Sequence, residues 1–348
     1  MMPEEWPIAA PAAYGNEPAR TAGRGRLATV RRDFFLDPAK RLTEQERALM
    51  TAMLHCLVGD IAAALRAALP GGRVAANDES DAALVEVLTA SGLLDEPALM
   101  ALLLRRADEE RIATAARARS GRREARVLQG LVSHDYGAVA AAAMALILGR
   151  GRRRDRFGQC LIAFDDLPQP SAEALVNAVA AALRRELAAG RGASSADGEL
   201  ADASSRVLDS HDEERGIDAL TAGLVHFLDE AGGLTDELIL AAANEGEIAF
   251  VAEVLARRAG IGSESAIDEL LSGDPQHVMA LFRMGGLSRA VSAGLLGGIG
   301  DLLGIDDAGA AIALFDAMSD AEVQAARAWL GTSASYRAAL ERLGQGRG

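Results

Sequence analysis

Apolar residues recur every third or fourth position along most of this chain, and this spacing constrains the fold more than any other feature. In the segment 42–69 the four-residue spacing is held by Leu49, Met53, Leu57, Ile61 and Leu65. Residues at this spacing lie on one face of a helix. Alternating runs of β-branched residues are almost absent, and aromatic residues make up only 4% of the chain, whereas strands favour both. The sequence therefore predicts an all-α protein.

Start signals precede several of these helices. Thr43 lies three residues before Glu46, and Ser319 lies three residues before Glu322. This is the spacing of a capping box, in which each residue of the pair satisfies a backbone amide of the other. Pro97 suits the first turn of a further helix. We expect short helices joined by tight corners.

The segment 234–261, LTDELILAAANEGEIAFVAEVLARRAGI, contains one such corner. Apolar residues have helical spacing in both halves, which are separated by Asn244, Glu245, Gly246 and Glu247. Asn and Gly suit the turn between two helices, and a Glu here would lie at the positive end of the second helix. Packing explains the corner. The alternative, a catalytic pair of carboxylates, requires a cleft and a raised pKa on one acid.

The helical units recur over roughly 30 to 45 residues, the range of helical-solenoid repeats. No strict sequence repeat accompanies them. We expect helical hairpins stacked as a HEAT-like solenoid, and an irregular helical bundle is the alternative.

Composition divides the chain into four parts. A segment rich in Pro, Ala and Gly at 1–20 predicts a mobile tail. An N-terminal helical domain follows at 21–189. At 190–205 glycine, serine, alanine and acids replace the periodic apolar residues, which predicts a linker. A C-terminal helical domain occupies 206–348.

Two stretches resemble a known family. They are RRDFFLDPAKRLTEQERALMTAMLHCLVGDIAAALRAAL, which begins at Arg31, and LTDELILAAANEGEIAFVAEVLARRAGIGSESAIDELLSG, which begins at Leu234 and is followed by MALFRMGGLS. The chain is similar here to the alphaproteobacterial domain-of-unknown-function family 2336, from Arg24 to Ala310. The similarity is spread over apolar and corner positions rather than a reactive motif. It implies a helical fold and supplies no catalytic residues.

The chain is acidic, with a formal net charge of −14 and a pI near 4.9. This charge opposes attraction of the whole surface to nucleic acid or anionic lipid. The N-terminal region has no basic leader, and the longest uncharged run, 136–149, is too short to span a bilayer. We expect a cytoplasmic protein without a membrane span, in which Cys56 and Cys160 are buried and reduced.

The sequence carries no recognisable motif for catalysis or for cofactor binding. His211 lies in the acidic stretch DSHDEERG, but the spacings of common metal sites do not occur. His55 and Cys56 are neighbours on a predicted helix, so their side chains diverge. The glycine run 294–304 lacks the GxGxxG spacing and a preceding strand, and we interpret it as close helix packing or a bent connection. We predict no catalytic residues, no cofactor and no metal site.

Arginines are concentrated in the first half of the chain, against this acidic background. The candidate partner-binding residues are Arg105, Arg106, Arg122, Arg123, Arg152, Arg153 and Arg154. Three interpretations remain open: a solvated face, a surface for an acidic protein partner, and a local nucleic-acid site.

These features together predict a non-enzymatic, cytoplasmic scaffold or regulatory adaptor that binds a protein partner through its helices. The alternative is nucleic-acid binding through the arginine-rich N-terminal domain. A further alternative is an enzyme or metal-binding protein that uses Glu245 and Glu247 or the acidic stretch around His211.

Overall fold

The structure, a computed structural model, describes residues 42–70, 78–120, 126–191, 193–333, 336–337, 339–340 and 343. Within these ranges the regular elements are helices, and a single isolated bridge pairs Arg154 with Cys160. The prediction of an all-α protein is confirmed.

The helices follow one another through short connections. The first are α2 (Glu44–Ala68), α3 (Asp78–Ala90), α4 (Pro97–Ser120), α5 (Arg126–Leu131) and α6 (Gly137–Arg152). Next come η2 (Phe164–Asp166), α7 (Gln169–Arg191), α8 (Ala193–Leu208), η3 (Glu213–Arg215), α9 (Ile217–Glu230), α10 (Asp236–Asn244) and α11 (Ile248–Ala259). The last are α12 (Ser263–Leu271), α13 (Pro275–Met284), α14 (Arg289–Leu295), η4 (Leu296–Gly300), η5 (Asp301–Leu303), α15 (Ala308–Ala317) and α16 (Asp320–Leu330).

Helix α2 begins as its sequence predicts. The Thr43 amide donates to Glu46 Oε2 at 2.8 Å, and the Glu46 amide donates to Thr43 Oγ1 at 3.2 Å, which completes the capping box. Its buried residues are Met50, Met53, Leu57, Val58, Ile61, Ala62, Leu65 and Arg66. Among the described helices α2 alone is long and apolar enough to cross a membrane, a test that buried core helices also pass.

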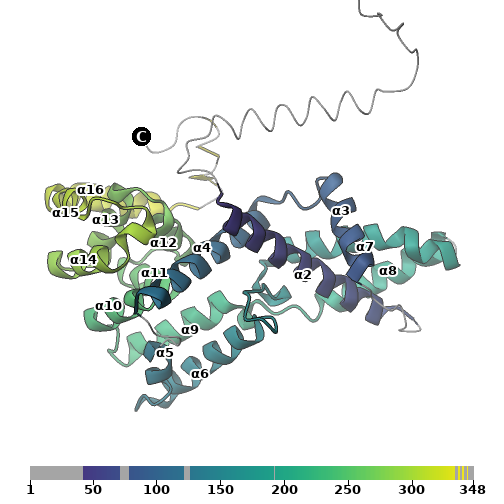
Figure 1. The fold of residues 1–348 in the computed structure, drawn as a ribbon, viewed down its shortest axis with the longest axis horizontal. Coiled ribbons are helices and arrows are strands. Elements are labelled where there is room, and N and C mark those ends of the chain that lie inside the picture. The colour runs from purple at the N-terminus through teal and green to yellow at the C-terminus, as the bar shows by residue number, and fades with distance from the viewer. Residues whose placement is uncertain are drawn as a thin grey trace, which may run out of the picture. The chain divides into compact units, whose positions relative to one another are not determined.

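The chain divides into two units, Met1–Arg47 and Ala48–Gly348. Within the second unit α7 packs on α8, α6 on α9, and α11 on α9, α12 and α13 (Figure 1). Helices distant in sequence also meet, because α4 packs on α11, and α10 packs on both α5 and α14. In a solenoid each repeat contacts its neighbours alone. The HEAT-like solenoid is therefore not confirmed, and the irregular helical bundle fits these contacts.

The predicted linker at 190–205 differs from the structure, which has helix α8 there. The buried residues of α8 are Ala196, Leu200, Ala203, Ser204 and Val207. They recur at helical spacing and pack against α7, and alanine favours a helix even where large apolar residues are few. The boundary predicted at this segment also differs, since Ala48–Gly348 is one compact unit. The tail predicted at 1–20 lies outside the described residues.

The corner between α10 and α11 is a close approach between backbones. Gly246 has a φ of +77°, and a Cβ there would lie 2.6 Å from Ala113 Cα on α4. Real Cβ atoms do not come so near a backbone carbon, and L side chains rarely adopt this φ. Position 246 therefore requires glycine for two separate reasons.

Both carboxylates of this corner make structural contacts. The Val127 amide donates to Glu245 Oε2 at 2.8 Å, so Glu245 ties the start of α5 to the end of α10. Glu247 is buried and forms an ion pair with Arg150 of α6. As predicted, packing accounts for the corner.

Replacement of Gly246 by Ala should destabilise the fold more than the same change at Gly260. Both glycines have positive φ, but a Cβ at Gly260 meets nothing within 4 Å. Gly260→Ala should therefore lower the free energy of unfolding by about 1–2 kcal/mol, for the left-handed conformation alone. Gly246→Ala should lower it more, because α4 must shift. Chemical denaturation of both variants measures the difference, and equal losses would contradict the close approach.

Candidate functional site

A cleft of about 580 Å³ lies between α4, α9, α11 and α12, beside the η2 and η3 segments. Its volume falls in the usual range for binding clefts, roughly 300–1,000 Å³. Uncharged side chains form part of its lining; these are Ala98, Ala101, Leu102, Leu167, Pro168, Ala219, Thr221, Ala249, Ala252, Ser263 and Ile267.

Carboxylates outnumber cations nine to one among the residues that line this cleft. The carboxylates are Glu109, Asp165, Asp166, Glu213, Glu214, Asp218, Glu253, Glu264 and Asp268, and the cation is Arg105. A concave surface lined by one sign of charge concentrates the electrostatic field and attracts the opposite charge. We call this site the acidic cleft.

One carboxylate of the acidic cleft is held ionised by two arginines of α4. Arg105 donates to Asp218 Oδ2 at 2.5 Å and Arg106 donates to Asp218 Oδ1 at 2.8 Å. Arg106 is buried and also contacts both carboxylate oxygens of Glu109. Burial alone would raise the pKa of Asp218, but the two guanidinium groups outweigh it and lower that pKa.

Two other carboxylates of the cleft are less favoured in the ionised form. Burial raises the pKa of Glu253, and the nearby Asp218 raises it further, although a hydrogen bond from Ser263 opposes both effects. Asp268 is exposed, but the atoms around it partly desolvate its carboxylate, and this raises its pKa more than the nearby Arg105 lowers it. A cation bound in the cleft would favour the ionised forms of both side chains.

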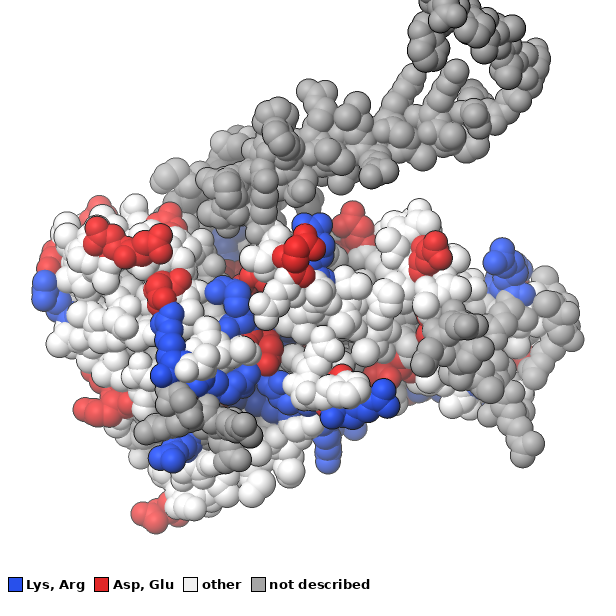
Figure 2. All heavy atoms as spheres, in the orientation of Figure 1, with Lys and Arg blue, Asp and Glu red and all other residues white. Residues whose placement is uncertain are grey.

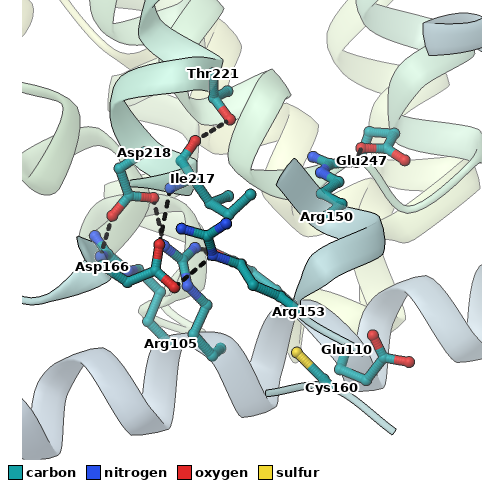
Figure 3. A network of polar contacts seen from close by, with 12 residues as sticks. Arg105, Glu110, Arg150, Arg153, Cys160, Asp166, Ile217, Asp218, Thr221 and Glu247 are labelled. Carbon is teal, nitrogen blue, oxygen red and sulfur yellow. Dashed lines mark hydrogen bonds and ion pairs between the residues drawn. The ribbon is translucent and has the colours of Figure 1, made fainter. Parts of the chain in front are cut away.

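A buried ion pair lies at the cleft, where α6, η2 and α9 meet (Figure 3). Arg153 donates to Asp166 Oδ2 at 2.7 Å, and its other nitrogens donate to the carbonyl oxygens of Gly149 and Arg215, each at 3.0 Å. The Asp166 side chain is 0% exposed and also accepts the Ile217 amide at 2.9 Å. A carboxylate at this first amide of α9 complements the positive end of the helix.

The structure places the predicted partner-binding arginines in different environments. Arg105 and Arg106 bind Asp218, as described above. Arg154 forms a two-pronged contact with Glu110, at 3.2 and 2.8 Å. Arg152 is exposed. Arg122 and Arg123 lie outside the described residues.

At Arg153 the prediction of a partner-binding side chain requires correction. Arg153 is buried, and its guanidinium donates hydrogen bonds within the chain, to the carboxylate of Asp166 and to the Gly149 carbonyl near the end of α6. Arginines and carboxylates also lie side by side across the middle of the molecular surface in Figure 2. The basic stretch RGRRRDR is therefore in large part a bracing element.

The histidine and the two cysteines that the sequence singled out do not form a reactive site among the described residues. Both ring nitrogens of His211 are engaged, by Gln169 Oε1 at 2.9 Å and by the Leu167 carbonyl at 3.0 Å. Cys56 is exposed, contrary to the expectation of a buried thiol. Burial, followed by Glu110, raises the pKa of Cys160 to about 11, so this thiol is protonated at neutral pH. Within the described ranges no group of three or more His, Cys, Asp or Glu could hold a metal ion.

The glycine run 294–304 is helical through α14, η4 and η5. A Cβ at Gly294 would lie 3.0 Å from Leu240 Cδ2, so close packing on α10 explains this glycine. Close packing thus accounts for Gly294, whereas a Cβ at Gly297 would meet nothing within 4 Å.

Sequence reasoning missed the acidic cleft. Arg106 and Asp218 are separated by 112 positions, and Glu253 and Asp268 belong to ordinary amphipathic helices with no distinctive spacing. Of the cleft carboxylates, only Glu213 and Glu214 lie in a stretch that composition singled out. No local signal could have brought the remainder together, since the contacts between α4, α9, α11 and α12 create the site.

The fold and the cleft define an all-α helical-bundle protein with an acidic cleft. The chain belongs to a family of uncharacterised proteins conserved in bacteria, DUF2336, whose family model matches residues 85–328. The family inferred from the sequence is thus confirmed. No curated protein and no solved structure matches the chain.

Replacement of Arg153 by Ser should destabilise the protein strongly, because Asp166 would keep a buried charge without its guanidinium partner. Removal of one partner of a buried pair costs about 3–5 kcal/mol. Arg152→Ser is the matched control and should change stability by no more than ~0.5 kcal/mol, as exposed positions do. Urea denaturation followed by circular dichroism compares the two; similar stabilities would contradict the bracing role of Arg153.

Replacement of Glu253 by Gln should raise the free energy of unfolding at neutral pH. The raised pKa means that the folded protein keeps this proton to a higher pH than the unfolded chain, whose Glu titrates near 4.5. Stability therefore falls as pH rises from the unfolded pKa through the folded pKa, and the variant avoids this loss. The advantage should vanish below pH ~4. Glu86→Gln, which removes an exposed carboxylate of α3, is the control for the change in net charge.

Proposed function

We propose that this protein is a non-enzymatic scaffold or regulatory adaptor that holds a basic segment of a protein partner in the acidic cleft. One observation carries the proposal: a cleft of about 580 Å³ is lined by nine carboxylates and one arginine. Four of the nine, Glu109, Asp165, Asp166 and Asp218, are already paired with arginines of the same chain, so the other five carry the surplus charge. Lysine and arginine side chains of a partner would supply the missing positive charge. Their aliphatic stems would pack on the alanines and leucines of the lining.

The accessible carboxylates of the cleft support a peptide occupant. Glu214, Glu264 and Asp268 are exposed and come from two separate parts of the chain. Several contacts along a cleft suit an extended or helical segment better than a small molecule with one charge. The raised pKa of Glu253 also favours a cationic occupant. The ionised form of this carboxylate lowers the stability of the fold, and a bound cation would offset that loss.

The charge of the partner differs from the one that the sequence suggested. An acidic partner requires arginines that are available on the surface. Arg105, Arg106, Arg153 and Arg154 are instead engaged by carboxylates or carbonyl oxygens of the same chain. The lining of the acidic cleft has a surplus of carboxylates, so the proposal takes a basic partner.

Nucleic-acid binding receives less support for the same reason. Phosphate contacts need several cations on one surface, and most of the described arginines of the first half are paired internally. Arg152 and Arg156 are exposed, and Arg156 stacks on Phe157 with its guanidinium carbon 4.7 Å from the ring centre. A nucleic-acid site in this stretch would use these two arginines for its phosphate contacts.

Binding of a fluorescein-labelled amphipathic helix of lysine and leucine tests the proposal by fluorescence anisotropy. The triple variant Glu214→Gln, Glu264→Gln, Asp268→Asn should bind this peptide about tenfold more weakly, since each exposed charge contact contributes roughly 0.2–1 kcal/mol. Added salt should weaken binding to the wild-type protein more than binding to the variant, because fewer ion pairs remain to be screened.

A second triple variant, Glu86→Gln, Asp209→Asn, Asp306→Asn, controls for net charge, because it removes three exposed carboxylates that do not line the cleft. It should bind as the wild type does. Equal weakening by the two triples would mean that the net charge, and not the cleft, attracts the peptide. Binding of duplex DNA or RNA that Arg152→Ser with Arg156→Ser abolishes, without peptide binding, would favour the nucleic-acid alternative.

A further inference from the structure

Helix α6 has an unusual composition for a helix at the surface. From Gly137 to Gly149 its sequence is GAVAAAAMALILG, in which every side chain is apolar or absent. A helix that is apolar all round is stable in water only when other structure covers its faces. The surroundings of α6 therefore indicate whether one of its faces still lacks a partner.

One face of α6 is buried by α9, which lies beside it in Figure 1. The buried residues of this face are Val139, Ala143, Leu146 and Gly149. The contact is close, since a Cβ at Gly149 would lie 2.7 Å from Leu220 Cδ1.

The opposite face of α6 is exposed. It comprises Gly137, Ala141, Met144, Leu148 and Arg152, which recur at helical spacing. Met144 is 42% exposed and Leu148 is 54% exposed. A continuous apolar stripe thus faces solvent along nearly the whole helix, and such stripes mark interaction surfaces. We call it the α6 stripe.

The two ends of the α6 stripe carry opposite charges. At the N-terminal end Asp135 and Glu230 are exposed, and the Tyr136 hydroxyl lies 3.5 Å from Glu230 Oε2. At the C-terminal end Arg152 is exposed on the stripe itself. Two copies of such a stripe are complementary when they lie antiparallel, because the acidic end of each then meets the basic end of the other.

We propose that the α6 stripe binds the α6 stripe of a second copy of this chain, antiparallel and about a two-fold axis. The midpoint of α6 lies beside Met144, so the axis passes close to this side chain. Ala141 then faces the partner's Leu148, a small residue against a large one, and Arg152 faces the partner's Asp135. A two-fold contact repeats each of these pairs twice.

The size of the stripe sets the strength of this association. A helix of 16 residues is about 24 Å long, so the contact is smaller than the roughly 800 Å² per partner of a standard interface. We therefore expect a dissociation constant in the micromolar range. The acidic end disfavours an anionic membrane as the occupant, because Asp135 and Glu230 would meet lipid charges of their own sign.

Sedimentation velocity over protein concentrations from about 1 to 200 µM, a range that brackets micromolar affinity, tests the proposal. The wild type should pass from monomer to dimer, and Met144→Glu with Leu148→Glu should remain monomeric. Leu314→Glu with Leu93→Glu is the matched control, since these residues are 42% and 53% exposed on other elements; this variant should dimerise as the wild type does. A wild type that stays monomeric at the highest concentration would overturn the proposal.

Charge exchange tests the antiparallel arrangement. Arg152→Glu alone should weaken the dimer at least tenfold, because two carboxylates would then meet at each end, and Asp135→Arg alone should do the same with two arginines. The double variant restores opposite charges and should dimerise again. Failure of the double variant to recover would overturn this arrangement.

Two further measurements separate this inference from other occupants and from the acidic cleft. Vesicles of anionic lipid should not bind the wild type; binding that the Met144→Glu, Leu148→Glu variant loses would mean that lipid and not a second copy covers the stripe. This variant should still bind the lysine–leucine peptide, because the stripe and the cleft share no residue. Failure of either proposal therefore leaves the other standing.

Discussion

The ion pair of Arg153 with Asp166 is the contact on which the centre of this fold depends. The Asp166 carboxylate is fully buried, accepts the Arg153 guanidinium and caps the first amide of α9. The same guanidinium holds the carbonyl oxygens at Gly149 and Arg215. The end of α6, the η2 segment and the start of α9 are therefore fixed together by one charge pair, and the acidic cleft is built in front of them.

The distribution of charge follows from this internal use of arginine. A buried charge requires a partner, and the described arginines near the centre find carboxylates or carbonyl oxygens across long sequence distances, as Arg106 does with Asp218 and Arg150 does with Glu247. The acids outnumber the bases in the chain, so the carboxylates that these pairs leave over face solvent. Several of them, including Glu214 and Glu264, gather at the cleft and make it acidic.

Local interactions made much of the helical structure predictable. The capping boxes of Thr43 with Glu46 and of Ser319 with Glu322 form as their spacing indicates, because all their atoms lie within one helical turn. Helix α8 was missed because alanine, serine and glycine resemble a linker in composition, although Leu200 and Val207 carry a helical spacing. In α8 the periodicity of the apolar residues, and not the composition, indicates the structure.

The sequence by itself determined that the protein is all-α, where many of its helices begin, and to which family it belongs, because these depend on spacing within a few turns and on similarity of residues. Tertiary structure alone decided which charges are paired and which face solvent. Arg152 and Arg153 are neighbours in an arginine run, yet one is exposed and the other buried. Helix geometry turns their side chains apart, and only the packing of α6 on α9 determines which of them points inward.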